Sequence, residues 1–168
     1  GSVKHVPACH SIIARSTNNT SCLLVPEGDI SEVRIMVEIG IEAAKILPKV
    51  NFILRLHPLL NLKKIIGHIT DIKNLPNNFV LSSSSLDQDT NSASWLAYRA
   101  SSVVFYGMAN GLRPIYINTD KSVDYNDPVP NSVSFRKVVD SVSELVEIIQ
   151  YDIEKLSDSV FYSNLGNI

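Results

Sequence analysis

Short runs rich in β-branched and other apolar residues alternate with longer stretches of helical pattern along most of this 168-residue chain. That alternation is typical of β–α–β units, in which crossover helices join parallel strands. We expect the strands at Cys22–Val25, Asn51–Leu56, Phe79–Leu81, Trp95–Arg99, Pro114–Ile117 and Phe135–Val139. The sequence therefore predicts an α/β fold, a Rossmann-like three-layer α/β/α domain with a mostly parallel sheet of about six strands.

Two capping signatures mark the starts of the strongest predicted helices. Asp29 is followed three residues later by Glu32, and Ser141 by Glu144, each in front of an apolar stripe at helical spacing. Gly111 suits the end of a helix, because glycine readily takes the left-handed conformation found there. The expected helices span 30–47, 61–72, 86–94, 103–109 and 142–156.

Composition indicates one folded domain without a nucleic-acid partner. The chain is 45% hydrophobic and 19% charged, as in ordinary globular proteins. Its 15 basic and 17 acidic residues leave a formal net charge of -2, whereas dedicated nucleic-acid-binding proteins carry a basic excess. No apolar run reaches the ~18–20 residues that a membrane-spanning helix needs.

The chain ends and the cysteines give further expectations. Gly1-Ser2 resembles a cleavage scar and no initiator methionine is present, so we expect a fragment of a longer protein. Residues 1–20 are interpreted as a tag remnant and linker, and residues 21–168 as the domain itself. Cys9 and Cys22 form neither a metal-ligand spacing nor a disulfide framework, which favours a cytoplasmic location.

Candidate site residues follow the ends of the predicted strands, where sheets of this kind bind their ligands. Glu27-Gly28 comes after the first strand. Its glycine allows a close backbone approach, and its carboxylate can accept a hydrogen bond from a ribose hydroxyl or a base amine. A Pro-Glu-Gly turn with a solvated carboxylate explains the same residues without a ligand.

The second strand ends in Arg55-Leu56-His57-Pro58. Strand alternation places Arg55 and His57 on the same side, and Pro58 restricts the backbone of His57. An imidazole there can donate a hydrogen bond to a phosphate or protonate a leaving phosphate oxygen. The alternative is a histidine that bonds only to the backbone at the end of a strand.

Ser101-Ser102 is placed between the fourth strand and the following helix. Free N–H groups at a helix start, together with two hydroxyls, can hold phosphate oxygens. Serine is also a favoured N-cap whatever the function. The serine run at 82–85 is a competing candidate that we interpret as a polar loop.

Known catalytic signatures are absent from the sequence. The chain has no Walker-type phosphate loop, no GxGxxG, no GxSxG and no HExxH. P-loop hydrolysis, dinucleotide-dependent hydride transfer and zinc proteolysis therefore have no support. His5, His10 and His68 lack partners at metal-ligand spacing, so we predict neither a metal site nor a cofactor.

Taken in chain order, Glu27-Gly28, His57-Pro58 and Ser101-Ser102 resemble the motifs of the C-terminal half of a GT-B glycosyltransferase. The likeness is to bacterial enzymes of capsular and other surface polysaccharide biosynthesis, including sialyltransferases and polysialyltransferases. Those enzymes carry an acidic-Gly motif, a His-Pro motif and a Ser/Thr pair. The stretch from Tyr98 to Tyr116 looks like the same family's Ser-Ser helix ending in Gly-x-x-Pro.

The resemblance covers residues 21–156, with two departures from the family's pattern. Pro26 stands where the acidic motif usually has another acidic residue. Residues 103–110 lack the glutamate that many GT-B enzymes carry after the serine pair.

The resemblance implies a nucleotide-sugar-binding domain whose donor is a CMP- or UDP-sugar. His57 would contact the donor phosphate and assist its departure, and Glu27 would lie near the reacting groups. The remaining expected ligand contacts are Gly28, Arg55, Pro58, Ser101 and Ser102. The acceptor site would lie in a missing N-terminal GT-B domain, so we expect no turnover by this domain alone.

The same resemblance implies that the full-length protein acts on a surface polysaccharide and associates peripherally with the inner face of the membrane. Two other readings remain open. One is a polyol-phosphate transferase or nucleotide-sugar epimerase domain of the same fold. The other is a non-catalytic Rossmann-like interaction module in which His57 and the two serines are structural.

Overall fold

The computed structural model describes residues 20–60, 65, 74–118 and 127–165. Its strands are β1 (Ser21–Val25), β2 (Asn51–Leu54), β3 (Phe79–Leu81), β4 (Trp95–Tyr98), β5 (Arg113–Ile117) and β6 (Lys137–Val139). Its helices are α1 (Ile30–Ile46), α3 (Leu86–Ser92), α4 (Val103–Ala109) and α5 (Val142–Leu165). Strands and helices alternate along much of this order, as the sequence pattern predicts.

The six strands form one sheet in the order β3-β2-β1-β4-β5-β6, and every neighbouring pair is parallel. The predicted Rossmann-like α/β fold is therefore confirmed. The order reverses between β1 and β4. The chain therefore builds β1, β2 and β3 on one side of this junction and β4, β5 and β6 on the other. Ligands of doubly wound sheets bind at the carboxyl ends of the strands at such a reversal.

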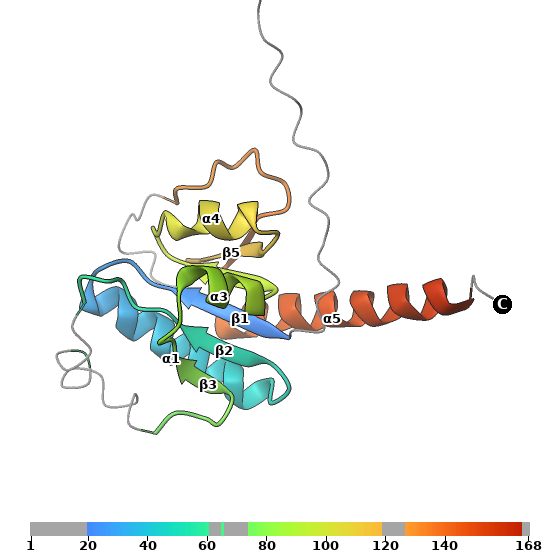
Figure 1. Ribbon diagram of the computed structural model, residues 1–168, viewed down its shortest axis with the longest axis horizontal. Helices are drawn as coiled ribbons and strands as arrows, with labels where there is room; N and C mark the ends of the chain where they lie inside the picture. The colour runs from blue at the N-terminus through green and yellow to red at the C-terminus, as the bar shows by residue number, and fades with distance from the viewer. Residues whose placement is uncertain (1–19, 61–64, 66–73, 119–126, 166–168) are drawn as a thin grey trace, which may run out of the picture.

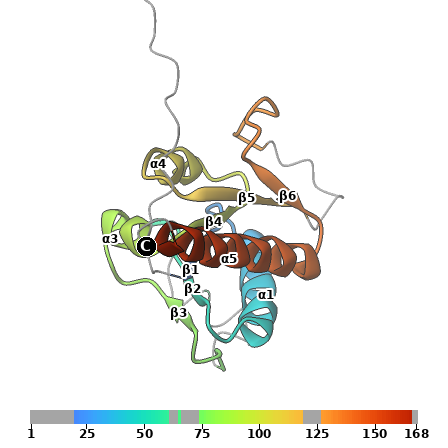
Figure 2. The same ribbon diagram turned by 90° about the vertical axis from the view of Figure 1, so that its right-hand side faces the viewer.

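Helices cover both faces of the sheet (Figures 1 and 2). On one face, α1 and α5 pack with strand residues such as Leu24, Phe52 and Ile117. On the other, residues such as Leu23 and Tyr98 pack with the first turn of α4 and with the chain around it. Because successive strand residues point to opposite faces, β1 is buried throughout and contributes to both cores.

The contact between α1 and the sheet depends on Gly40. A Cβ added at Gly40 would lie only 2.5 Å from Leu24 Cδ1 and from Phe79 Cε2. Both of those side chains are buried, at 0% and 3% exposure. The absent side chain at Gly40 therefore lets the helix axis lie close over β1 and β3.

Several strand boundaries differ from the predicted ones. β2 ends at Leu54 instead of Leu56, because the chain turns at His57, whose carbonyl accepts from Leu60 N–H at 2.9 Å. β4 ends at Tyr98 instead of Arg99, before a left-handed residue, Ala100, with a φ of 50°. A residue in that conformation cannot continue a strand.

The last two elements also differ from prediction. β6 is confined to Lys137–Val139, and α5 continues past Leu156 to Leu165. The predicted helix at 61–72 lies outside the described residues except for Ile65, which is helical and buried. The predicted linker at 1–20 lies outside them except for Thr20, whose hydroxyl donates to Lys49 O at 3.0 Å.

The capping box predicted for α1 is only half correct. Asp29 is the N-cap, and its Oδ1 accepts from the backbone N–H of Ser31 at 2.8 Å. Hydrogen bonds from the hydroxyl and amide of Ser31 hold the pKa of Asp29 below its ordinary value. Glu32 does not return to the cap, because its carboxylate is buried against Arg99 instead.

The starts of α3 and α5 carry reciprocal side-chain caps. At α5, Ser141 Oγ accepts from Glu144 N–H at 3.3 Å, while Glu144 Oε2 accepts from Asp140 N–H at 2.7 Å. At α3, Ser85 and Gln88 form a complete capping box. Part of the serine run interpreted as a polar loop is thus a helix cap.

Candidate functional site

Three of the predicted motifs leave the sheet from three neighbouring strands. β1 lies between β2 and β4, with Leu24 paired to Leu54 and Val25 paired to Tyr98. The loops that begin after these strands carry Glu27-Gly28, His57-Pro58 and Ser101-Ser102. Neighbouring strands are about 4.8 Å apart, so the three loop origins span about 10 Å along this edge.

The first and second motifs lie close together. A Cβ added at Gly28 would lie 3.4 Å from Cγ and Nδ1 of the His57 ring. That distance is an ordinary van der Waals contact, so a small side chain would fit at this position. Gly28 thus lies beside the imidazole, but the spacing does not require the close backbone approach for which the sequence suggested a glycine.

The orientation of His57 is fixed by its own turn. Its Nδ1 accepts a hydrogen bond from Leu59 N–H at 3.3 Å, and its carbonyl accepts from Leu60 N–H at 2.9 Å. Because Nδ1 is an acceptor, the proton of the neutral ring lies on Nε2. The half-buried His57 thus carries its N–H donor on the nitrogen that the turn does not use.

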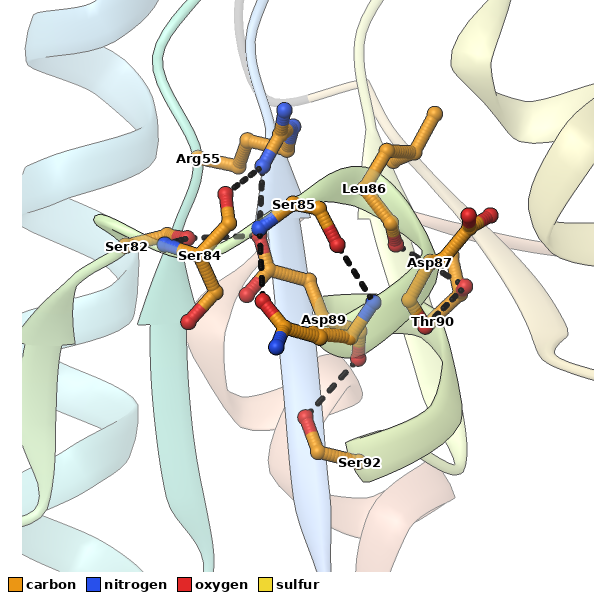
Figure 3. Close-up of polar contacts among 10 residues, drawn as sticks. Arg55, Ser82, Ser84, Ser85, Leu86, Asp87, Asp89, Thr90 and Ser92 are labelled. Carbon is orange, nitrogen blue, oxygen red and sulfur yellow. Dashed lines mark hydrogen bonds and ion pairs between the residues drawn. The ribbon is translucent and has the colours of Figure 1, made fainter.

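Arg55 was predicted to lie within a strand, but it follows the end of β2 and forms an ion pair. β2 has ended before it, and its Nη1 donates to Asp89 Oδ2 at 2.8 Å and to Ser84 O at 2.9 Å. Ser82 Oγ donates to the same Asp89 oxygen at 2.6 Å. Figure 3 shows the two remaining guanidinium nitrogens on the side away from Asp89. The ion pair thus occupies one edge of the guanidinium only.

Asp89 is a residue that the sequence reading did not single out. Its side chain is 5% exposed and comes from α3, whereas Arg55 and Ser82 follow β2 and β3. A buried carboxylate of this kind requires hydrogen-bond donors, and these two side chains supply them. The serine run at 82–85 includes Ser82, which donates to Asp89, but the sequence pattern did not indicate this contact.

Glu27 is half-buried in the loop between β1 and α1. Among the described residues, its carboxylate forms no ion pair or hydrogen bond. Pro26, just before it, is buried and continues the line of β1. The turn therefore presents Glu27 and Gly28 at the carboxyl edge of the sheet.

The two serines differ from each other. Ser101 is buried at 5% exposure, and its carbonyl accepts from Val104 N–H at 3.3 Å. Ser102 is exposed and precedes α4, but its side chain makes no capping hydrogen bond. The structural explanation offered for Ser102, an ordinary N-cap, therefore does not account for its hydroxyl.

A buried ion pair links the first turn of α1 to the residue that follows β4. Arg99 Nε donates to Glu32 Oε2 at 2.6 Å, and both side chains are 1% exposed. Arg99 Nη1 also donates to Ile117 O at 3.1 Å, at the carboxyl end of β5. Sequence pattern gave no sign of this pair, because Glu32 matched a capping residue and Arg99 matched the end of a strand.

Part of the segment between β5 and β6 is also anchored to this edge, although its residues 119–126 lie outside the described part. Asp127 Oδ1 accepts from Tyr98 OH at 2.8 Å, and its other oxygen pairs with Arg136. Burial and the Asp127 carboxylate raise the pKa of Tyr98 well above its ordinary value. Tyr98 is therefore a hydrogen-bond donor at any physiological pH.

Two further properties concern only the residues that the structure describes. Within them, no three His, Cys, Asp or Glu side chains gather as a metal-binding group. In the same part of the chain, no helix has the length and apolar character needed to cross a membrane.

Comparisons with known proteins show structural similarity but no sequence family. No protein-family model matches the chain, and no curated protein matches it. The fold is similar to a solved structure described as the glycotransferase of kitacinnamycin, with a TM-score of 0.55 and 14% sequence identity. The alignment covers 97% of this chain and 41% of the neighbour. The chain has a glycosyltransferase-like fold. It spans about two fifths of the neighbour's length.

Proposed function

We propose that this chain is the donor-binding domain of a glycosyltransferase, which holds a nucleotide-activated sugar at the carboxyl ends of β1, β2 and β4. The observation that carries the proposal is the orientation of His57 beside Gly28, with Nδ1 of its ring accepting from Leu59 N–H and Nε2 left as the donor. A glycosyltransferase-like fold supports the general activity, and the motif order supports the ligand.

The donor phosphates are the groups that these side chains suit best. In the proposed complex, His57 Nε2–H donates to a phosphate oxygen, and the outer nitrogens of Arg55 add positive charge beside it. Asp89 takes up only one edge of that guanidinium. The hydroxyl of Ser102, unused as a cap, is a third donor from the other side of β1. Three donors from two loops, after β2 and after β4, match a phosphate better than any one of them alone.

The proposed reaction transfers the sugar to an acceptor hydroxyl. The bond between the anomeric carbon and the phosphate oxygen breaks, and the acceptor oxygen forms a new bond to that carbon. Negative charge develops on the leaving phosphate, where His57 and Arg55 stabilise it. Glu27 takes up the acceptor proton or orients the acceptor, which fits a carboxylate that forms no ion pair with the described residues.

The finer assignment follows the motif resemblance. We propose a CMP- or UDP-sugar donor, a surface polysaccharide acceptor of the bacterial capsular or sialyltransferase type, and no cofactor. The acceptor site then lies in an N-terminal GT-B domain outside this chain, and the domain alone binds donor without turnover. The full-length protein is placed in the cytoplasm, at the inner face of the membrane, in contact with no nucleic acid.

Calorimetric titration of the chain with CMP, CDP, UDP and GDP tests the proposal. We expect saturable binding in the high-micromolar to millimolar range, which corresponds to about 4–6 kcal/mol. Tighter binding of the cytidine nucleotides supports a sialyltransferase-like donor, and tighter binding of UDP supports another sugar class. If all four nucleotides fail to bind at millimolar concentration, the donor-binding assignment is wrong, and the non-catalytic interaction module becomes the better account.

A further inference from the structure

We propose that Glu32 and Arg99 are positioning residues, which hold the loops after β1 and β4 at the separation that the donor requires. The inference rests on the proposed function, since it names a part of the same site. Neither residue is expected to touch the ligand. Their effect passes through the loops that carry Glu27-Gly28 and Ser101-Ser102.

The geometry of the pair suits that role. Glu32 lies in the first turn of α1, three residues after the N-cap Asp29, and Arg99 is the first residue after β4. Their 2.6 Å hydrogen bond therefore crosses the point where the strand order reverses. The second bond of Arg99, to Ile117 O at 3.1 Å, adds the end of β5 to the same assembly.

Stability alone does not explain a pair buried this completely. Both side chains are 1% exposed, so both charges have lost their hydration, and Glu32 Oε1 is buried with no hydrogen-bond partner in the described part of the chain. Replacing such a pair with apolar residues of similar volume is often neutral or stabilising. An ion pair, unlike an apolar pair, supplies a directed bond of fixed length. That bond sets the relative position of the two loops.

The residue after Arg99 indicates that the loop is held in place. Ala100 has a φ of 50°, a left-handed conformation that costs free energy for any residue with a Cβ. Such a conformation persists where the surroundings determine it. With Arg99 tied to two other elements and Ser101 buried, the chain reaches Ser102 along a single path.

The test compares the wild-type chain with the double variant Glu32→Leu/Arg99→Met, which removes both charges and preserves most of the buried volume. We expect a melting temperature at or above that of the wild type, together with at least a tenfold loss of affinity for the preferred nucleotide. Amide hydrogen exchange at Ser101, Ser102 and Val104 should quicken in the variant without any ligand present.

The matched control removes a different ion pair, at the opposite edge of the sheet. Arg113 and Asp152 lie 3.0 Å apart where β5 begins, with side chains 33% and 22% exposed. The variant Arg113→Met/Asp152→Leu should change neither the nucleotide affinity nor the exchange at Ser101 and Ser102.

Wild-type affinity and unchanged exchange in Glu32→Leu/Arg99→Met would overturn the inference. If the double variant does not fold, Arg99→Lys replaces it, because a lysine ammonium cannot bond to Glu32 and Ile117 in the same forked arrangement. We then expect a folded protein with a three- to tenfold weaker affinity, and wild-type affinity would contradict the positioning role. If the wild type itself binds no nucleotide, the proposed function fails, and the exchange comparison still decides whether the pair orders the loop.

Discussion

At the scale of single residues, the two ring nitrogens of His57 have separate tasks. Nδ1 accepts from Leu59 N–H and so belongs to the turn, whereas Nε2–H is the donor that we assign to the ligand. Pro58, between His57 and Leu59, restricts the backbone of this turn. The sequence indicated a polar histidine at this point, but which nitrogen bonds to the backbone depends on the path of the turn, which no residue pattern specifies.

Two substitutions separate these tasks. Asparagine places an acceptor near the position of Nδ1, and glutamine places a donor near the position of Nε2. We expect His57→Gln to keep most of the nucleotide affinity and His57→Asn to lose about tenfold, since a hydrogen bond to a charged group contributes about 1.5 kcal/mol or more. Calorimetry measures both, with the melting temperature as the check on folding. Equal affinities in the two variants would argue against an Nε2 contact.

Cys22 has a predictable chemistry because it lies in the centre of the sheet. Burial raises the pKa of its thiol to about 12, from an ordinary value of 9.0. The thiolate is the reactive form, so in a Cys9→Ser background we expect no alkylation by iodoacetamide at pH 8 until the protein unfolds. Mass spectrometry with and without denaturant checks this, and rapid alkylation of the native protein would contradict the burial of β1.

The same shift fixes the sign of one pH effect. The unfolded chain loses the Cys22 proton near its ordinary pKa of 9.0, whereas the folded chain keeps it up to about 12. Between these values the unfolded state binds fewer protons, so this group lowers the free energy of unfolding as the pH rises. Chemical denaturation from pH 8 to pH 10 should therefore show a fall in stability that Cys22→Ala reduces.

At the scale of the elements, helix α1 is held close to the sheet by a missing side chain. Gly40→Ala would place a methyl group 2.5 Å from Leu24 and Phe79. Overpacking of a buried contact costs about 1–3 kcal/mol, and the gain in helix propensity returns only about 1 kcal/mol. We expect a net loss of about 1 kcal/mol in chemical denaturation. Glu38→Ala, exposed on the same helix, is the control, and a Gly40→Ala protein as stable as the wild type would contradict the close packing.

Helix α3 is attached to the carboxyl edge of the sheet through Asp89. Removing this carboxylate leaves Arg55 and Ser82 without their shared acceptor, and Arg55 is 24% exposed, so water replaces part of the loss. We expect Asp89→Ala to lower the free energy of unfolding by about 2 kcal/mol and to weaken nucleotide binding as Arg55 loses its orientation. Asp87→Ala, on the exposed side of the same helix, should affect binding little. Unchanged affinity in Asp89→Ala would remove Arg55 from the site.

The elements also show where sequence reading succeeds and where it fails. The run that became α1 was visible because its buried face imposes a helical period, and β1 and β4 were visible as short apolar runs because both of their faces are buried. The buried ion pair of Glu32 could not be predicted, because a glutamate three residues after an N-cap fits a capping box and a buried pair equally well. Its partner, Arg99, is 67 residues away in the chain, and only the packing of β1 beside β4 brings the two together.

At the scale of the whole molecule, the strand order places three loops with separate origins at one edge. Parallel strands with right-handed crossovers made this edge the expected position of a site. Sequence alone could name Glu27-Gly28, His57-Pro58 and Ser101-Ser102, but could not show that Gly28 lies beside His57. It also missed the anchors beneath the loops, Asp89 and the Glu32–Arg99 pair, because their partners come from distant segments.

The measurement that tests the central claim most directly is a titration of the ¹⁵N-labelled chain with its preferred nucleotide, followed by amide chemical shifts. The account predicts that the largest changes occur at Gly28, Leu59, Ser101 and Ser102, at the carboxyl ends of β1, β2 and β4. Residues at the opposite edge, such as Ser21 and Ser94, should stay unchanged. Shifts concentrated at that opposite edge, or no shifts at millimolar nucleotide, would contradict it.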